Sequence, residues 1–508
     1  MYSTAMPGAV LAVAMIAVCA YAADEVQEIH NPLGFATSMT NANNGDLLLM
    51  RGNKRMRISG GGETVGEVEK MPMGISGVTR LDDQYLICRT GMKFFISADD
   101  GTTWEKRGEI DKEAISGGEG AFPGWIGLGV PNYDVLIRAN DGRLFLPVRG
   151  CAAASEVLAR QLAASAIIEG THANVEGHAH RPEADYSFCY FSEDEGRTWK
   201  KSEGTIIIWK DNGFGGMWPA DEPCMIDLPD GELRMFFRTT LGRIYTSRSG
   251  PVDVELRGGA WSPEKRQHIS APAGVYWDIP LPTDLAAAYT PCRVRRIPST
   301  GDLLLVWNQV SSDEIRGSYS RCRLSTAISR DQGQTWTHFR TIDRAVIAPA
   351  GRVAPDPEPS MARALNFVGE IPGDWAHLDY PNLGFFEDKV AISWTRATKQ
   401  PLPGQARGPR LLIAPVSWLY EDDDAYTAPA GSPKLVIGNP GREVDATWID
   451  DRFLVNLTDI AAAFGRDAPH NMVCTLRQAV TALEVEALYD ESQMDDANDP
   501  MMRVIEKK

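Results

Sequence analysis

The chain has 508 residues, of which 43% are hydrophobic and 23% charged, so it can bury a sizeable core. It has 51 lysine and arginine residues and 68 aspartate and glutamate residues, so the formal net charge is −17. A chain this acidic is a poor nucleic-acid binder, because little offsets repulsion by phosphate, and no basic block favours a membrane surface. The net charge does not exclude the binding of small ligands, because arginines can cluster locally in an acidic protein.

The first 22 residues differ from the rest of the chain. They carry no acidic or basic side chain, residues 9–20 are almost entirely apolar, and Ala20-Tyr21-Ala22 has the small-x-small form of a cleavage site. We therefore predict a signal peptide over 1–22, cleaved near Ala22, and a secreted or periplasmic protein without a membrane partner. The alternative is an anchor helix, for which the apolar run is shorter than the ~20 residues a span needs.

The eight cysteines are scattered and form no C-x-x-C pair. We interpret them as buried free thiols rather than as zinc ligands or a disulfide framework. The segment 172–180 holds three histidines without supporting cysteine or carboxylate spacing, so we interpret it as a solvated loop. The sequence predicts no metal site and no cofactor, with a structural Ca²⁺ left open.

From residue 30 onward the chain indicates strands and turns. Short apolar runs follow Asn-Gly, Asp-Gly or Thr-Gly pairs, which is typical of hairpin turns that lead into buried strands. Such runs begin at Asn44, Asp141, Asp230 and Thr300. No Pro- or Ser-rich linker divides the chain, so we expect one domain over 23–489, followed by an acidic polar tail over 490–508 that is frayed.

An eight-residue motif, S-x-D-x-G-x-T-W, occurs three times and decides the predicted fold. The copies lie at 97–104, 192–199 and 329–336. In a hairpin turn of this form the Asp accepts backbone N–H groups, Gly takes a left-handed conformation, and Trp packs beneath the turn.

This motif resembles the Asp box of the sialidase (neuraminidase) superfamily. The resemblance implies an all-β, six-bladed β-propeller of four-stranded blades, with each box between the outer strands of a blade. Asp boxes are structural in that superfamily and lie away from its active site, so they predict the fold and not the reaction.

The resemblance also implies a set of site residues. Sialidases clamp a substrate carboxylate with arginines, attack with a Tyr activated by a Glu, and use an Asp as acid/base catalyst. The segment 221–238 is similar to the superfamily's Glu, LPDG and Arg segment, which makes Glu222 the base and Arg238 a clamp residue. The structural alternatives are a solvated carboxylate for Glu222 and a salt bridge for Arg238.

Two further residues follow from the same resemblance. Arg321, in the strand before the third Asp box, is the second clamp candidate, and Arg323 is its alternative because strand alternation puts both on one face. Tyr380, in Asp379-Tyr380-Pro381-Asn382, is the candidate nucleophile, with a tyrosine packed at a strand end as the alternative. Trp218, four residues before Glu222, is a candidate for stacking on a sugar ring.

Part of the sialidase pattern is absent. Ala36 stands where the first clamp arginine is expected, and the short loop 51–55 lacks the acid/base Asp. Arg51 or Arg55 are candidates to replace the missing arginine. Asp134 and Glu119 are candidates to replace the missing acid, although most such carboxylates are simply solvated.

These observations favour a secreted exo-acting glycoside hydrolase for a terminal acidic sugar, sialic acid or another carboxylated sugar. One alternative is a carbohydrate-binding propeller that has lost catalysis, as Ala36 and the acid-free loop would allow. Another is a propeller enzyme of other chemistry, such as a lyase or a non-sialic glycosidase.

Overall fold

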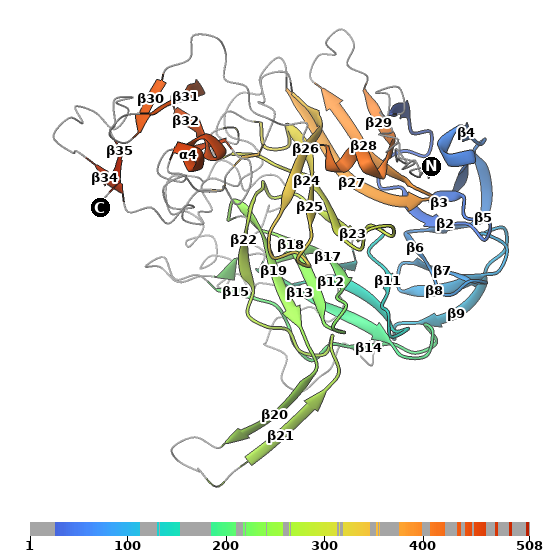
Figure 1. Cartoon of the computed structure of the whole chain (residues 1–508). Helices are drawn as coiled ribbons and strands as arrows, with labels where there is room; N and C mark the ends of the chain where they lie inside the picture. The colour runs from blue at the N-terminus through green and yellow to red at the C-terminus, as the bar shows by residue number, and fades with distance from the viewer. Residues whose placement is uncertain are drawn as a thin grey trace, which may run out of the picture.

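The computed structural model describes part of the chain between residues 26 and 506, and the account below concerns these residues. They are 26–111, 130–131, 133–152, 184–209, 217–218, 220–239, 241–257, 264, 266–311, 314, 319–345, 352–353, 355, 375–398, 407–421, 434–437, 442–449, 452–463, 473–475, 487–489 and 504–506. The predicted signal peptide, Glu119 and the segment 172–180 lie outside them. The described residues confirm the predicted all-β fold, a propeller of six radially arranged antiparallel sheets (Figure 1).

The first three blades follow one another along the chain, each running outward from a first strand that borders the centre. The strands of blade 1 are β2 (Ser38–Asn41), β3 (Leu47–Ser59), β4 (Thr64–Val65) and β5 (Glu69–Ile75). Those of blade 2 are β6 (Gly77–Arg80), β7 (Leu86–Thr90), β8 (Lys93–Ser97) and β9 (Glu105–Glu109). Those of blade 3 are β10 (Val130–Pro131), β11 (Ile137–Arg138), β12 (Leu144–Ala152), β13 (Ala184–Ser192) and β14 (Lys200–Lys201).

Blades 4 to 6 complete the ring. The strands of blade 4 are β17 (Asp221–Asp227), β18 (Leu233–Arg238), β19 (Arg243–Ser249) and β22 (Leu281–Ala286). Those of blade 5 are β23 (Arg293–Arg296), β24 (Leu303–Asn308), β25 (Arg323–Ser329) and β26 (Thr337–Arg344). Those of blade 6 are β27 (Ala376–Phe386), β28 (Lys389–Thr398), β29 (Gly408–Pro415) and β1 (Gln27–His30).

Strand β1 closes the ring from the other end of the chain. It pairs antiparallel with β29, so that Gln27 lies opposite Ile413. Blade 6 therefore takes three strands from residues 376–415 and its outer strand from the start of the described chain. Because β1 leads along the chain to β2 of blade 1, this pairing ties the first blade to the last.

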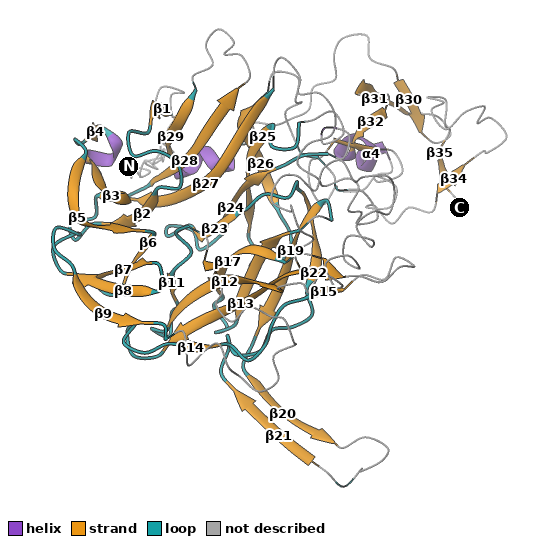
Figure 2. Cartoon of the chain, turned by 180° about the vertical axis from the view of Figure 1, so that it is seen from behind, coloured by secondary structure: helices purple, strands orange, loops and turns teal. Residues whose placement is uncertain are grey.

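Several smaller elements lie outside the blades. The pair β15 (Ile208–Trp209) and β16 (Met217–Trp218) and the hairpin β20 (Val252–Arg257) and β21 (Arg266–Ala271) flank blade 4, and the hairpin extends well beyond the ring (Figure 2). The helical turns are η2 (Gly60–Gly62), η5 (Val416–Tyr420) and α4 (Leu457–Ala463). No helix among the described residues is long and apolar enough to span a membrane.

A separate six-stranded sheet follows the ring along the chain, in the order β33-β32-β31-β30-β35-β34. Val504–Glu506, within the tail that we expected to be frayed, form β35 and pair with β34 and β30. The six strands are β30 (Lys434–Ile437), β31 (Arg442–Ile449), β32 (Arg452–Asn456), β33 (Val473–Thr475), β34 (Ala487–Tyr489) and β35 (Val504–Glu506).

The second strands of the blades carry much of the core. All six residues of β24 are buried, and so are all six of β18. A strand is buried on both faces when its sheet is stacked between two neighbours, which explains the unbroken apolar runs after the Asn-Gly and Asp-Gly turns. The described cysteines belong to this interior as buried free thiols, as expected: Cys88, Cys189, Cys224, Cys292 and Cys322.

The three Asp boxes lie where the resemblance predicted, between the two outer strands of blades 2, 3 and 5 (β8 and β9, β13 and β14, β25 and β26). In the first box the Ser97 hydroxyl donates to Asp99 and accepts the backbone N–H of Gly101, both at 2.8 Å. Asp99 also accepts the backbone N–H and the hydroxyl of Thr103, at 2.8 and 2.7 Å. The other two boxes repeat these four bonds within 0.1 Å.

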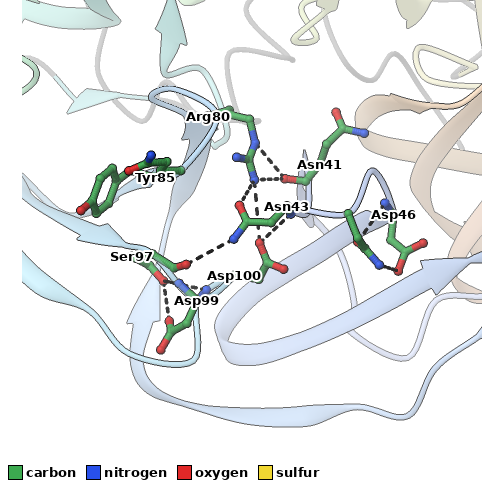
Figure 3. A network of polar contacts seen from close by, with 12 residues as sticks. Asn41, Asn43, Asp46, Arg80, Tyr85, Ser97, Asp99 and Asp100 are labelled. Atoms are coloured by element: carbon green, nitrogen blue, oxygen red, sulfur yellow. Dashed lines mark hydrogen bonds and ion pairs between the residues drawn. The ribbon is translucent and has the colours of Figure 1, made fainter.

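The boxes also hold neighbouring blades together. Trp199 of the second box stacks on Phe94 of blade 2, with ring centroids 4.1 Å apart. Asp100 of the first box accepts the backbone N–H of Asn43 in blade 1, whose side chain in turn donates to Ala98 (Figure 3). These inter-blade contacts make the first and second boxes joints of the ring as well as turns.

Candidate active site

The candidate residues gather at one edge of the ring. Antiparallel pairing puts the start of each first strand beside the end of the second, as with Asp221 and Arg238 in blade 4 or Asp379 and Thr395 in blade 6. The Asp boxes join the two outer strands of a blade, after one further reversal of chain direction, and therefore lie at the opposite edge. We call the edge that carries Asp221 and Asp379 the mouth.

Blade 4 contributes a buried ion pair to the mouth. Arg238 is 2% exposed and donates from Nε and Nη2 to Oδ2 of Asp221, at 2.9 and 2.6 Å. The Tyr289 hydroxyl donates to the same oxygen at 2.6 Å, and its ring lies 4.0 Å from the Arg238 guanidinium. Arg149 of blade 3 contacts the other oxygen at 3.3 Å.

These partners keep Asp221 ionised. Burial alone would raise the pKa of its carboxyl group, but the charges of Arg238 and Arg149 and the Tyr289 hydrogen bond lower that pKa overall. Burial likewise acts to lower the pKa of Arg238, and the charges of Asp221 and Glu222 raise it well above its usual value. The cluster is therefore a stable ionic unit at any pH near neutrality.

Glu222 lies in a bulge at the start of β17, where the pairing with β18 shifts register between Asp221 and Cys224. Its φ of 42° is left-handed, a conformation that costs a non-glycine residue about 1–3 kcal/mol and that clusters at functional sites. Its carboxylate lies 2.9 Å from Nη1 of Arg238 and is 15% exposed. The bulge turns the carboxylate toward the arginine that Asp221 holds.

Tyr380 occupies a matching position in blade 6. The pairing of β27 with β28 shifts register between Asp379 and Asn382, and Tyr380 has a φ of 45°. Burial and the nearby charge of Glu222 raise the pKa of its phenol, while the charges of Arg238 and Arg321 act to lower it. Tyr380 is thus protonated at neutral pH and lies within the electric field of all three predicted partners.

Arg321 is held from blade 6. It forms an ion pair with Asp379, and its Nη2 donates to the backbone carbonyl of Tyr289 at 3.3 Å. His377 lies 3.1 Å from Asp379. Burial would raise the pKa of Asp379, but the hydrogen bond from His377 and the charge of Arg321 lower it to about 2.

The two arginines converge. Nη1 of Arg238 approaches the Tyr289 carbonyl oxygen to 3.5 Å, so guanidinium groups from blades 4 and 5 meet at one atom. Arg323, the alternative to Arg321, is instead fully buried against Glu314 and the carbonyl of Gln309. Of the two candidates, Arg321 is therefore the one at the mouth beside Tyr380.

Aromatic side chains surround the predicted nucleophile. The rings of Phe35, Tyr133 and Tyr380 lie 5.8 Å apart in all three pairs. Tyr133 is 40% exposed, so this cluster reaches solvent. It occupies the side of the mouth nearest blade 1, where the expected arginine is replaced by Ala36.

Asp134 is a brace rather than an exposed acid. It is buried, and its carboxylate accepts the backbone N–H groups of Met39 and Val78, each at 3.3 Å. It also accepts from Asn382 at 2.7 Å and from Arg295 at 2.9 Å. Both carboxylate oxygens of Asp134 accept hydrogen bonds, and these bonds link blades 1, 2, 5 and 6. The side chain is buried and is therefore not placed to contact a substrate.

The two arginines predicted as replacements for the missing clamp residue lie in different places. Arg55 binds Glu69 and the carbonyl of Asp100, away from the mouth, whereas Arg51 lies against Phe35. Trp218 is on β16, and its side chain is outside what the structure describes. Among the described residues no group of three His, Cys, Asp or Glu side chains is suited to a metal ion.

Sequence reasoning missed Asp221, Tyr289, Asp379, Phe35 and Tyr133. Asp221 and Asp379 each directly precede a predicted site residue, and an acid next to a site residue is a usable signal. Tyr289 carries no such signal, because its role depends on a contact with Asp221 across 68 residues.

The family described as the BNR repeat-like domain matches residues 82–390, which is more than half of the chain. The chain belongs to this family. That result confirms the predicted membership of the sialidase-like Asp-box propellers. A search of curated proteins gave no match.

Solved structures with a similar fold are distant. A Trypanosoma rangeli sialidase in complex with the inhibitor DANA is 12% identical, with a TM-score of 0.40 over 76% of this chain and 55% of that one. The GH93 alpha-L-arabinofuranosidase of Fusarium graminearum with arabinobiose is also 12% identical, with a TM-score of 0.39 over 78% and 99%. This chain thus covers about half the length of the first protein and nearly all of the second.

Proposed function

We propose that this protein is an exo-acting glycoside hydrolase that removes a terminal carboxylated sugar, with Tyr380 as nucleophile and Glu222 as its base. The observation that carries the proposal is the convergence of Arg238 and Arg321 on the Tyr289 carbonyl oxygen. Glu222 is ion-paired to the first arginine, and the residue before Tyr380 is ion-paired to the second. The mouth thereby combines a phenol, a carboxylate and two cations.

The proposed reaction has two steps. Glu222 takes the phenolic proton as Tyr380 attacks the anomeric carbon, and the electron pair of the breaking bond goes to the leaving-group oxygen. Water then displaces the tyrosine, which regains its proton from Glu222, and the proton of the water neutralises the leaving group through solvent. The positive charge of Arg238 and Arg321 favours the phenolate, since both act to lower the pKa of Tyr380.

Arg238 and Arg321 are suited to bind a carboxylate group of the substrate. A neutral phenol is a better nucleophile than a carboxylate beside such an anion, because it carries no charge to be repelled before the attack. Planar guanidinium groups bind carboxylates through paired hydrogen bonds. This supports an acidic terminal sugar, with Arg238 and Arg321 on its carboxylate side.

The test uses aryl glycosides whose leaving group needs no proton. The wild-type protein, Tyr380→Phe and Glu222→Gln are assayed with fluorogenic sialic-acid and uronic-acid glycosides. We expect Tyr380→Phe to lose roughly 10³-fold or more in kcat. Tyr276→Phe, which alters a half-buried tyrosine whose hydroxyl donates to Glu203, is the matched control and should keep wild-type turnover.

A second candidate is a carbohydrate-binding propeller without catalysis. It is favoured by the pairing of Arg238 and Arg321 with carboxylates of the chain itself, and by the burial of Asp134, whose carboxylate is held by groups of the chain. Absence of turnover by the wild-type protein, together with sugar binding in calorimetry, would support this candidate over the hydrolase.

A further inference from the structure

Two buried thiols face each other close to the mouth. Sγ of Cys224 in blade 4 lies 3.7 Å from Sγ of Cys292, the residue that precedes β23 of blade 5. The two residues are 68 positions apart in the chain and belong to the same apolar cluster of the core. A disulfide has an S–S distance of about 2.05 Å, so the two sulfur atoms are roughly 1.7 Å from bonding distance.

The surroundings make the two thiols unequal. Their hydrogen bond lowers the pKa of Cys224 and raises that of Cys292 well above its usual value, because Cys292 keeps the shared proton. Burial opposes the shift at Cys224, and the positive charges of Arg293 and Arg295 support it. Arg293 donates to the carbonyl oxygens of Cys292 and Tyr133, at 2.7 and 2.9 Å, and these neutral acceptors leave its charge in place. Cys224 is therefore the thiol that more readily becomes a thiolate, the form that reacts.

An oxidant that reaches this pair must be small. Cys224 is 4% exposed and Cys292 is fully buried, so a reagent meets Cys224 first. Hydrogen peroxide is scarcely larger than water, and peroxides oxidise thiolates to sulfenic acids. A sulfenic acid at Cys224 faces the Cys292 thiol, which is the arrangement in which a second cysteine completes a disulfide.

We propose that Cys224 and Cys292 are an oxidation site at which a peroxide forms a disulfide between blades 4 and 5. The Cys224 thiolate attacks one oxygen of hydrogen peroxide and breaks the O–O bond, which yields a sulfenic acid and hydroxide. The Cys292 thiol then attacks the sulfenic sulfur and releases its proton, and the hydroxyl group leaves as water. Two thiols and one hydrogen peroxide thus give one disulfide and two waters, with the peroxide as the two-electron acceptor.

The disulfide acts on the mouth through two short segments. Cys224 is the first residue after the bulge in β17, two residues beyond Glu222. Cys292 is three residues beyond Tyr289, at whose carbonyl oxygen the two arginines of the mouth converge. The sulfur atoms must approach by roughly 1.7 Å, and a displacement of about 1 Å at a catalytic site can cost roughly 100-fold in rate. This effect on turnover rests on the proposed function, whereas the formation of the disulfide does not.

The first test detects the bond itself. The full chain is reduced and then treated with hydrogen peroxide, its remaining thiols are alkylated in denaturant, and an unreduced tryptic digest is analysed by mass spectrometry. Cys224 lies in tryptic peptide 211–234 and Cys292 in peptide 267–293, so we expect these peptides to be joined and to separate after addition of dithiothreitol. Peptides that stay unlinked, whether alkylated or carrying a sulfinic acid, would overturn the proposal.

A second measurement follows stability, with a matched control. A disulfide that closes a long loop restrains the unfolded chain, so we expect oxidation to raise the Tm of the wild-type protein by roughly 5 °C. Cys224→Ala and Cys292→Ala should show no such rise, and either variant serves if the other does not fold. Cys189→Ala, which removes a buried thiol 3.3 Å from the Gly274 carbonyl oxygen, should respond to peroxide like wild type. An equal rise in the Cys224 and Cys292 variants would contradict the assignment.

Turnover separates this inference from the hydrolase proposal. On an acidic glycoside that the reduced wild-type protein hydrolyses, we expect oxidation to lower kcat about tenfold or more and dithiothreitol to restore it. Methionine sulfoxide needs dedicated reductases, so recovery with dithiothreitol identifies the disulfide as the cause. If the reduced protein hydrolyses no glycoside, the hydrolase proposal fails, and the linked peptides still support the oxidation site. Linked peptides with an unchanged kcat would overturn the effect on the mouth.

Discussion

Two aspartates show how differently this propeller uses the same side chain. Asp99, in an Asp box at the outer part of blade 2, binds Ser97 and Thr103, which lie two and four residues away. Asp221, at the mouth of blade 4, binds Arg238 and Tyr289, which lie 17 and 68 residues away. Local contacts can be repeated as a motif, whereas the contacts of Asp221 exist only once the blades are assembled.

The difference has an energetic side. The Asp99 turn faces solvent, so water can replace part of what a substitution removes. Asp221 is buried, and removal of its charge takes away the carboxylate that both Arg238 and Arg149 contact in a medium of low dielectric constant. Each of the three Asp boxes therefore contributes little to the free energy of unfolding. The residues of the mouth contribute both to stability and to the proposed chemistry.

The largest effect is expected at Asp221. Asp221→Asn keeps the shape of the side chain and removes the charge that faces Arg238 and Arg149. We expect a loss of about 3–5 kcal/mol in the free energy of unfolding, measured by urea denaturation. A loss below about 1 kcal/mol would mean that the mouth does not depend on this ion pair and would remove the contrast with Asp99.

An intermediate effect is expected from pH at Asp379. Its pKa is about 2 in the folded chain against 3.8 when unperturbed, so its ionisation favours the folded state. That contribution, about 2 kcal/mol, is fully present above pH 5 and is lost as the pH falls through 4 toward 2. Urea denaturation of wild type and Asp379→Asn across this range should give stabilities that differ at pH 5 and converge near pH 2. A constant difference between the two proteins would contradict the assignment.

The smallest effect is expected in an Asp box. Ser97→Ala removes the hydroxyl that donates to Asp99 and accepts from Gly101. We expect a loss of about 1 kcal/mol in the free energy of unfolding and no change in turnover, because the turn is at the edge opposite the mouth. A large loss of activity in a protein of near-normal stability would show that the two regions are coupled.

The sequence predicted the fold better than the site. The three boxes were identified because each is complete within eight residues, and the structure repeats their hydrogen bonds almost unchanged. At the mouth, the resemblance selected Glu222, Arg238, Arg321 and Tyr380, which the fold brings together. It did not indicate that Asp134, a candidate acid, is buried between four blades, because burial depends on segments far apart in the chain.

The sequence by itself determined the turns and the strand periodicity, because those features depend on contacts between near neighbours in the chain. The propeller was predicted through the resemblance of its three local turns to the Asp boxes of sialidases. Only the tertiary structure decided which carboxylate pairs with which arginine, and that Arg51 rather than Arg55 lies beside Ala36. The partners of a mouth residue come from other blades, and their proximity follows from ring closure by β1 and β29 rather than from any local pattern.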